Sequence, residues 1–274
     1  MSSVKKEYCL FLRTEHGSKI YNDFKDILYS KYDSLVVKLC SDYLYRIALL
    51  KEDDINICDI GGGDGKRIIQ ILSYLHSKYK NNFNLDFVEQ SPIYCKVFEE
   101  SNKTIRSFCQ VKVFDDYFEN LSLNPQYDVI FLIHSIFAFD NGNSINKIVS
   151  LLKPAGKIIV VSNSPSSFLA KLKFIVDSVY SDNRYEINDL EKSLASLSYQ
   201  YSKYSFITDW IIPKSNIETE LETIFDWISL GEYYNYSKLK KEELLKYALS
   251  ECVLDKNKYY FREEEIVLII PPVQ

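Results

Sequence analysis

A glycine-rich stretch between a strand pattern and a helix pattern constrains the fold of this chain most strongly. Residues 56–60, Asn-Ile-Cys-Asp-Ile, alternate in hydrophobicity as a buried strand does, and glycines follow at 61, 62, 63 and 65. Apolar residues then recur at helical spacing over 68–75. A turn this tight needs residues that adopt positive φ and lack a Cβ, and the first N–H groups of the helix point at whatever lies there. The stretch therefore predicts a strand, a ligand-binding loop and a helix.

The spacing of the glycines separates three kinds of loop that begin this way. The dinucleotide motif G-x-G-x-x-G requires glycine at 66 or 68, where the chain has Lys66 and Ile68. The P-loop motif G-x-x-x-x-G-K-[ST] fails at Ile60 and again at Arg67. An acidic residue, Asp59, followed by alternate glycines is what remains. This pattern resembles the first motif of the class I S-adenosylmethionine-dependent methyltransferases.

The composition favours a globular enzyme that acts on a small molecule. The chain has 274 residues, a net charge of −5 and no cluster of Lys and Arg, which argues against nucleic acid as a partner. No apolar run approaches the roughly 18 residues of a membrane span, and the first residues do not form a secretory signal. The six cysteines include no C-x-x-C pair, so we expect no metal site. We predict a cytoplasmic protein, monomeric or weakly oligomeric, without a membrane partner.

Strand and helix patterns alternate from the glycine loop to about residue 162. Alternation of this kind predicts a parallel sheet with right-handed crossovers. Pro154 to Gly156 is expected to form a turn that opens the last of these strands. We predict an α/β, Rossmann-like, doubly wound sheet of seven strands whose last strand is antiparallel. The expected strands are 55–60, 84–89, 110–114, 127–133 and 156–162, and the expected helices are 65–79, 92–104 and 142–152.

The flanking segments follow other patterns. Residues 1–50 have helical periodicity and are expected to form two or three helices that contribute to the substrate region. Residues 51–165 are expected to form the cofactor-binding core, and 166–274 a lid and substrate region within the same compact unit. In this last part we expect helices at 168–180 and 187–197, the second capped by Asn188 or Asp189, a strand at 200–212, helical structure over 216–250 and a final strand at 265–270.

Polar residues at the ends of predicted strands are the first candidates for chemistry. In an open α/β sheet, ligands bind beyond the carboxyl ends of the strands, where the strand order reverses. Glu89 lies close to the spacing of about 20 residues at which an acid binds ribose hydroxyls, although a glutamate here can also cap a helix. Asp115 can accept a hydrogen bond from an adenine amino group or simply form a turn. His134 can move a proton or pack against the following turn.

Over nearly its whole length the chain also resembles the histamine N-methyltransferase family. The matches are Glu15-His16-Gly17 with Tyr21 and Phe24, Ile60 to Gly65, Gln70-Ile71-Leu72, Val88-Glu89-Gln90-Ser91, Tyr127-Asp128-Val129-Ile130, Val160-Val161-Ser162, Asp226-Trp227 and the terminal apolar strand. The resemblance implies S-adenosylmethionine as cofactor and methylation of a small amine. It adds Gln90 and Ile133 to the cofactor contacts. The cofactor-binding candidates are Asp59, Gly61, Gly63, Gly65, Glu89, Gln90, Asp115, Ile133 and His134.

The residues expected to bind the methyl acceptor depart from the family pattern. His134 replaces a glutamine, Glu263 an asparagine and Phe168 a tryptophan, while Asp33 lies near the family's N-terminal glutamate. A pocket with more negative charge would suit a dibasic or guanidino amine. The alternative is that Glu263 belongs to a solvated acidic start of the last strand. The acceptor-binding candidates are Tyr21, Phe24, Asp33, Phe137, Phe168, Trp227 and Glu263.

Methyl transfer from a sulfonium needs alignment, removal of water and a neutral nucleophile. An amine must therefore lose its proton before attack, and the catalytic candidates for this step are His134, Asp33 and Glu263. We predict an S-adenosylmethionine-dependent N-methyltransferase of a small cationic amine. Two alternatives stay open: methylation of a peptide side chain or a carboxylate, and a non-catalytic interaction protein that binds the cofactor.

Overall fold

The computed structural model describes residues 10–28, 36–42, 44, 54–124, 127–138, 141–176 and 186–272. These residues belong to two compact units. The core unit consists of residues 33–162, 185–204 and 267–274, and the auxiliary unit of residues 1–32, 163–184 and 205–266. Within the described ranges, no helix has the length and apolar character that crossing a membrane requires.

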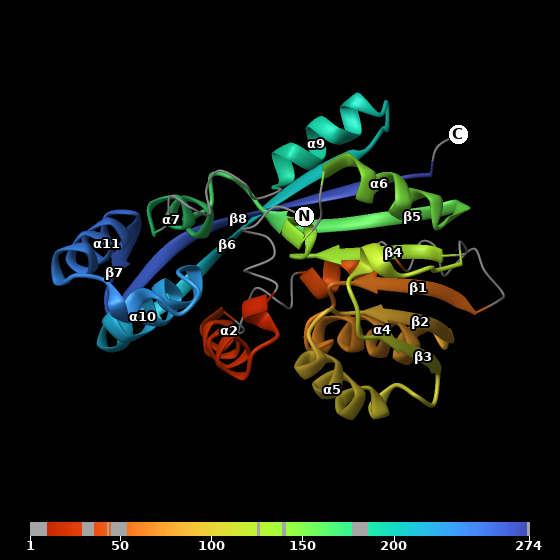
Figure 1. The fold of residues 1–274 in the computed structure, drawn as a ribbon, viewed down its shortest axis with the longest axis horizontal. Helices are drawn as coiled ribbons and strands as arrows, with labels where there is room; N and C mark the ends of the chain where they lie inside the picture. Colours follow the sequence, from red (N-terminus) through yellow and green to blue (C-terminus); the bar gives the residue numbers. More distant parts are fainter. Residues whose placement is uncertain are drawn as a thin grey trace. The chain divides into compact units, whose positions relative to one another are not determined.

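A parallel sheet forms the centre of the core unit (Figure 1). Strand β1 pairs with β2 and β4, β2 pairs with β3, and β4 pairs with β5, all in parallel. The whole sheet has eight strands in the order β3-β2-β1-β4-β5-β8-β6, with β7 paired to β8. The core-unit strands are β1 (Ile55–Ile60), β2 (Phe83–Val88), β3 (Cys109–Phe114), β4 (Tyr127–Ile133) and most of β5 (Leu152–Asn163).

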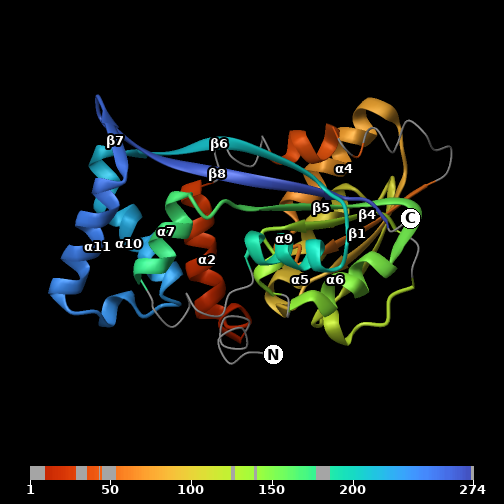
Figure 2. The same cartoon turned by 90° about the horizontal axis from the view of Figure 1, so that it is seen from above.

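Helices cover the sheet of the core unit because each has one apolar face. Helix α4 (Lys66–Tyr79) buries Ile68, Ile71, Leu72 and Leu75, which recur at helical spacing. Figure 2 shows α4 on the opposite side of the sheet from α6 (Asn141–Ser150) and α9 (Ile187–Ser196). Helix α4 connects β1 to β2 and α6 connects β4 to β5, so these two crossovers lie on opposite faces of the sheet, as in a doubly wound fold. The predicted fold class is confirmed.

The order of the strands identifies where a ligand is expected. The chain proceeds outward from β1 to β2 and β3, and then returns to place β4 on the other side of β1. The strand order therefore reverses between β1 and β4, and open α/β sheets bind ligands at the carboxyl ends of such a pair. The glycine loop after Ile60 and the residues after Ile133 both lie at this point.

The auxiliary unit contains α2 (Glu15–Leu28), α7 (Phe168–Val176), α10 (Ile217–Ile228), α11 (Lys238–Ser250) and β7 (Cys252–Asp255). It also contains most of β6 (Ser202–Pro213) and of β8 (Lys258–Ile270). Within this unit the helices lie on one side of the ribbon formed by β6, β8 and β7 (Figure 2). Alternation along β6 explains this packing, since Thr208, Trp210 and Ile212 are buried and the residues between them are exposed.

Several predicted elements differ in their details. Strand β8 is longer than the predicted 265–270, and β7 was not predicted. The helical pattern over 216–250 forms two helices, because Gly231, at φ 86, interrupts it. The N-cap of α9 is Glu186, whose side chain and that of Asp189 form a capping box. Residues 154–156 lie within β5, where the register with β4 shifts.

Candidate functional site

The glycine loop turns the chain from β1 into α4 at the expected ligand-binding edge. Gly61 N–H donates to Val88 O at 2.8 Å, which fixes the start of the loop to the end of β2. Gly65 is the N-cap residue of α4. Gly63 has φ 60, and a Cβ added there would meet no atom within 4 Å. The open side of the loop is therefore at Gly63, where a ligand can approach bare backbone.

Ser135 packs against the first glycine of the loop from the neighbouring strand end. A Cβ added to Gly61, which has φ 72, would lie 2.5 Å from Ser135 Cβ. Only glycine fits this contact between the ends of β1 and β4. The Ser135 hydroxyl is buried and has no hydrogen-bond partner among the described residues. A buried hydroxyl without a partner is unfavourable by about 1–3 kcal/mol, so a bound ligand that engages it would gain affinity.

Glu89 joins the glycine loop to the end of β2. Its Oε2 accepts a hydrogen bond from Gly63 N–H at 2.9 Å, and its Oε1 accepts one from Ser91 N–H at 2.8 Å. The side chain is 6% exposed. Burial raises the pKa of Glu89, the backbone N–H groups of Ser91, Gly63 and Gln90 oppose this effect, and the carboxylate of Asp115 adds to it. The acid predicted to bind ribose thus lies beside the open glycine of the loop.

Asp59 lies under the loop rather than at its surface. It is 4% exposed, and burial raises its pKa to about 7. Burial is the largest cause of this rise in the pKa, the negative charge of Glu89 contributes to it, and the positive charge of Arg67 opposes it. Two carboxyl groups therefore lie close together beneath and beside the loop.

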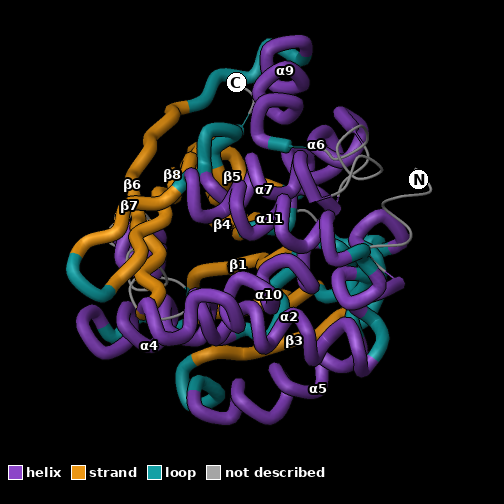
Figure 3. The backbone as a smooth tube through the Cα atoms, turned by 90° about the vertical axis from the view of Figure 1, so that its left-hand side faces the viewer, coloured by secondary structure: helices purple, strands orange, loops and turns teal. Residues whose placement is uncertain are grey.

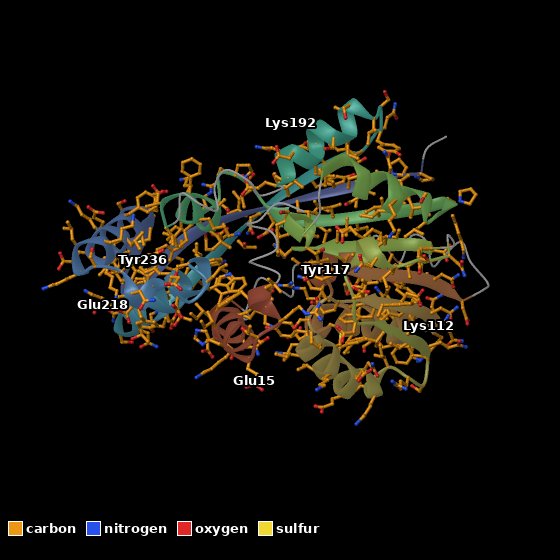
Figure 4. The ribbon with its side chains drawn as sticks, viewed as in Figure 1. Glu15, Lys112, Tyr117, Lys192, Glu218 and Tyr236 are labelled. Atoms are coloured by element: carbon orange, nitrogen blue, oxygen red, sulfur yellow. The ribbon has the colours of Figure 1, made fainter. Side chains whose placement is uncertain are left out.

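The loop after β3 is fixed at two points. Asp116 Oδ1 accepts hydrogen bonds from Tyr117 N–H at 2.7 Å and from Asn120 Nδ2 at 2.8 Å. Figure 4 shows Tyr117, which follows the two acids in this loop. Farther along, Lys147 Nζ on α6 donates to the carbonyl oxygens of Phe118, Glu119 and Leu121 at 2.8, 3.0 and 2.8 Å. The segment that begins at Asp115 is thus held to α6.

The residues after β4 have an unusual backbone. His134 has φ 54, a left-handed conformation that is uncommon for a residue other than glycine, and its N–H donates to Val161 O at 2.8 Å. Ile133 is 8% exposed at the end of the strand. Gln90 and Phe137 are half-buried. Backbone strain of this kind often occurs at functional sites, which supports His134 as a site residue.

The predicted aromatic residues for the acceptor gather within the auxiliary unit. The Trp227 ring lies 4.6 Å from the Tyr21 ring and 5.5 Å from the Phe24 ring, centroid to centroid. Trp210 connects Phe24 to Phe168, at 6.2 and 5.9 Å. Lys25 Nζ lies 4.8 Å from the centre of the Tyr21 ring. Tyr21, Phe24, Phe168 and Trp227 therefore belong to one chain of ring contacts.

Glu263 lies inside the auxiliary unit, and the alternative of a solvated acidic segment is wrong for this residue. The side chain is 0% exposed. Its Oε1 accepts a hydrogen bond from Leu169 N–H at 2.6 Å, at the start of α7, and its Oε2 one from Asn163 Nδ2 at 3.4 Å. Burial raises its pKa to about 7. A role in binding the acceptor stays a prediction for Glu263, and Asp33 lies outside the described residues.

These contacts fit a ligand with a polar part that carries hydroxyl groups. Gly63 offers open backbone, Glu89 offers carboxylate oxygens, and the Asp115 segment follows the next strand in the sheet. Sequence reasoning placed Ser135 beside His134 at this edge without giving it a role, and it missed Lys147. Ser135 directly follows a predicted site residue, which is a usable signal, whereas Lys147 has no local signal at all.

No protein-family model and no curated protein sequence matches this chain. Solved structures do match it. The plantazolicin methyltransferase BpumL, in complex with a triazolic desmethylPZN analog and SAH, is 14% identical, with a TM-score of 0.57 over 98% of this chain and 97% of its own. The methyltransferase candidate BH2331 of Bacillus halodurans C-125 is 16% identical, with a TM-score of 0.56 over 84% and 99%.

A third similar structure is a candidate sarcosine dimethylglycine methyltransferase from Galdieria sulphuraria. It is 12% identical, with a TM-score of 0.54 over 89% of this chain and 91% of its own. Nothing in these matches links the chain to the histamine N-methyltransferase family. At these identities the likeness concerns the fold alone, and the chain has the Rossmann-like fold of these methyltransferases.

Proposed function

We propose that this protein is an S-adenosylmethionine-dependent methyltransferase. The main support is the arrangement of Gly63 and Glu89, an open glycine beside a buried acid at the end of the next strand. Gly63 follows β1, one of the two strands between which the strand order reverses, and Glu89 follows the neighbouring strand β2, in a fold that this chain shares with methyltransferases. One of the similar structures contains SAH, the product of methyl transfer from this cofactor.

Each part of the site has a role in this proposal. The loop from Gly61 to Gly65 lies against the amino-acid end of the cofactor, and Glu89 accepts hydrogen bonds from its ribose hydroxyls. Asp115 accepts a hydrogen bond from the adenine amino group. When bound, the cofactor supplies an activated methyl group on sulfur. The protein then has to orient the acceptor, exclude water and receive one proton.

Binding of S-adenosylhomocysteine, measured by isothermal titration calorimetry, tests the cofactor. A Gly63→Asn variant is the sharpest probe, because asparagine tolerates the left-handed backbone of Gly63 and fills the open space beside it. We expect the affinity to fall at least about tenfold, equivalent to about 1.4 kcal/mol. Lys80→Asn is the matched control, since Lys80 is exposed and has φ 63 at the other end of α4. If the unmodified protein gives no heat of binding with S-adenosylhomocysteine, the proposal is wrong.

We propose further that the acceptor is a small cationic amine, with the nitrogen lone pair attacking the methyl carbon as the bond to sulfur breaks. The products are S-adenosylhomocysteine, the methylated amine and one proton. The ring contacts around Trp227 support a cationic acceptor, because aromatic faces attract ammonium groups. His134 remains the residue we propose for receiving the proton.

A screen of amines with labelled S-adenosylmethionine tests the acceptor. We expect transfer to cationic amines and a Tyr21→Leu variant whose KM for them rises about 3- to 30-fold, the range of a lost cation–π contact. Tyr74→Leu is the control, since Tyr74 in α4 also has a lysine, Lys78, beside its ring. Transfer only to peptide side chains or carboxylates would replace the amine assignment. Cofactor binding without transfer to any acceptor would indicate a non-catalytic protein.

A further inference from the structure

A hollow in the auxiliary unit lies at the junction of β6 with the turn between β7 and β8. Its volume is about 730 Å³. Figure 3 shows β6 beside the two strands of the hairpin. The end of β6 and the short helix η4 (Lys214–Asn216) form one wall, and the turn forms the other. The lining residues are Pro213, Lys214, Ser215, Asp255, Lys256, Asn257, Lys258 and Tyr260.

The backbone holds the two walls of this hollow together. Lys214 N–H donates to Asn257 O at 2.9 Å, which ties the start of η4 to the hairpin turn. In the antiparallel register of the hairpin, Asp255 lies opposite Lys258 and Val253 lies opposite Tyr260. Lys256 is at the tip with φ 54, a conformation that glycine and asparagine adopt far more readily than lysine. The hollow is therefore bounded by hydrogen-bonded backbone rather than by side chains alone.

The charged side chains that line the hollow are mainly basic. Three of them are lysines, at 214, 256 and 258, and one is the acid Asp255, which leaves a formal excess of two positive charges. In the part of the chain that the structure describes, no carboxylate lies within ion-pair distance of these lysines. Glu218, exposed in the first turn of α10 (Figure 4), is not a lining residue. This excess contrasts with the net charge of −5 of the chain.

We propose that this hollow binds a small molecule with a diphosphate group. Its volume lies within the roughly 300–1,000 Å³ of small-molecule sites. Lysine ammonium groups are flexible point charges that bind phosphate oxygens, and three in one hollow match the two to three negative charges of a diphosphate. The half-buried Tyr260 supplies an aromatic wall for an attached organic part. The site is independent of the proposed methyl transfer.

Titration calorimetry with inorganic pyrophosphate at about 0.15 M salt, without divalent cations, tests the site directly. We expect a dissociation constant below about 1 mM, equivalent to about 4 kcal/mol. Replacement of Lys214, Lys256 and Lys258 by glutamine should weaken binding at least tenfold. The matched control replaces three exposed lysines of the same unit, Lys19, Lys238 and Lys246, by glutamine and should change it less than twofold. Affinity for S-adenosylhomocysteine should be the same in all these variants.

A single substitution tests whether weaker pyrophosphate binding results from a loss of folding. Lys256→Gly removes one charge and places glycine where φ is 54, so the hairpin should be at least as stable as before. We expect several-fold weaker pyrophosphate binding with no decrease in Tm. No binding by the unmodified protein, or equal weakening in the control variant, would overturn the proposal. Citrate binding as tightly as pyrophosphate would overturn the diphosphate assignment.

Discussion

Replacement of Lys147 by methionine should loosen the loop that begins at Asp115. Methionine keeps the unbranched stem beside Phe118 and removes the ammonium group that donates to three carbonyl oxygens. Hydrogen bonds to a charged group contribute about 1.5–3 kcal/mol when both partners stay dry. The contact with Glu119 O is exposed, and carbonyl oxygens that lose the ammonium group can accept hydrogen bonds from water instead. We therefore expect the variant to lower the free energy that holds the loop in place by about 2 kcal/mol.

The effect should be visible in cofactor affinity, because the clamped segment directly follows Asp115. If the whole effect of about 2 kcal/mol is lost from the binding free energy, S-adenosylhomocysteine binds about 30-fold more weakly, and if about half of it is lost, binding is about 5-fold weaker. Titration calorimetry on Lys147→Met measures this. Lys157→Met is the matched control, since Lys157 is an exposed lysine of β5 in the same unit.

A double-mutant cycle with Asp115→Asn separates positioning from general stability. If Lys147 acts through Asp115, the double variant should bind no more weakly than the weaker single variant. Purely additive losses would show that the clamp does not act through Asp115. A Lys147→Met protein that folds and binds S-adenosylhomocysteine as tightly as the unmodified protein would refute the reasoning altogether.

Two further predictions concern buried polar groups. Burial raises the pKa of Glu263 from 4.5 to about 7, so the folded protein keeps a proton that the unfolded chain releases between these values. The stability that the protonated Glu263 contributes is present below pH 4.5 and is lost as the pH rises through 7. In urea denaturation, the Glu263→Gln variant should therefore be about 2–3 kcal/mol more stable than the unmodified protein at pH 8, and equally stable at pH 4.5. Ser135→Ala should raise the Tm of the ligand-free protein and weaken S-adenosylhomocysteine binding several-fold, since it removes a buried hydroxyl that has no protein partner. An unchanged pH dependence, or a lower Tm, would contradict these expectations.

The sequence predicts the core unit well because its signals are local. Strands β1 and β4 are short, mainly apolar runs, β2 and β3 alternate apolar with polar residues, and the buried residues of α4 recur at helical spacing. The auxiliary unit is harder, because it is assembled from three separate segments and its strands are buried on one side only. Strand β8 begins with Lys258 in an exposed, charged hairpin, which alternation alone does not distinguish from a loop.

The site shows the same division between local and distant signals. Glu89 was predictable from its spacing after the glycine loop, because the parallel register of β1 and β2 fixes which residue ends beside the loop. The partners of Glu263, Leu169 N–H and Asn163, are about 100 residues away in sequence, and no local pattern indicates them. The same holds for Lys147, which is useful to the loop only because the sheet brings α6 to it.

Unfavourable features are concentrated at one place in the core unit. The left-handed backbone of His134, the unpartnered hydroxyl of Ser135 and the raised pKa values of Asp59 and Glu89 all occur at the carboxyl ends of β1, β2 and β4. The left-handed backbone of His134 and the unpartnered hydroxyl of Ser135 each lower the stability of the ligand-free fold by about 1–3 kcal/mol. Local rules are usually broken where function requires it, and a ligand that donates to Glu89 and engages the Ser135 hydroxyl would offset part of this cost. Cofactor binding should therefore stabilise the core unit by more than a contact with any one of these groups alone would, because one bound molecule satisfies more than one unfavourable polar group.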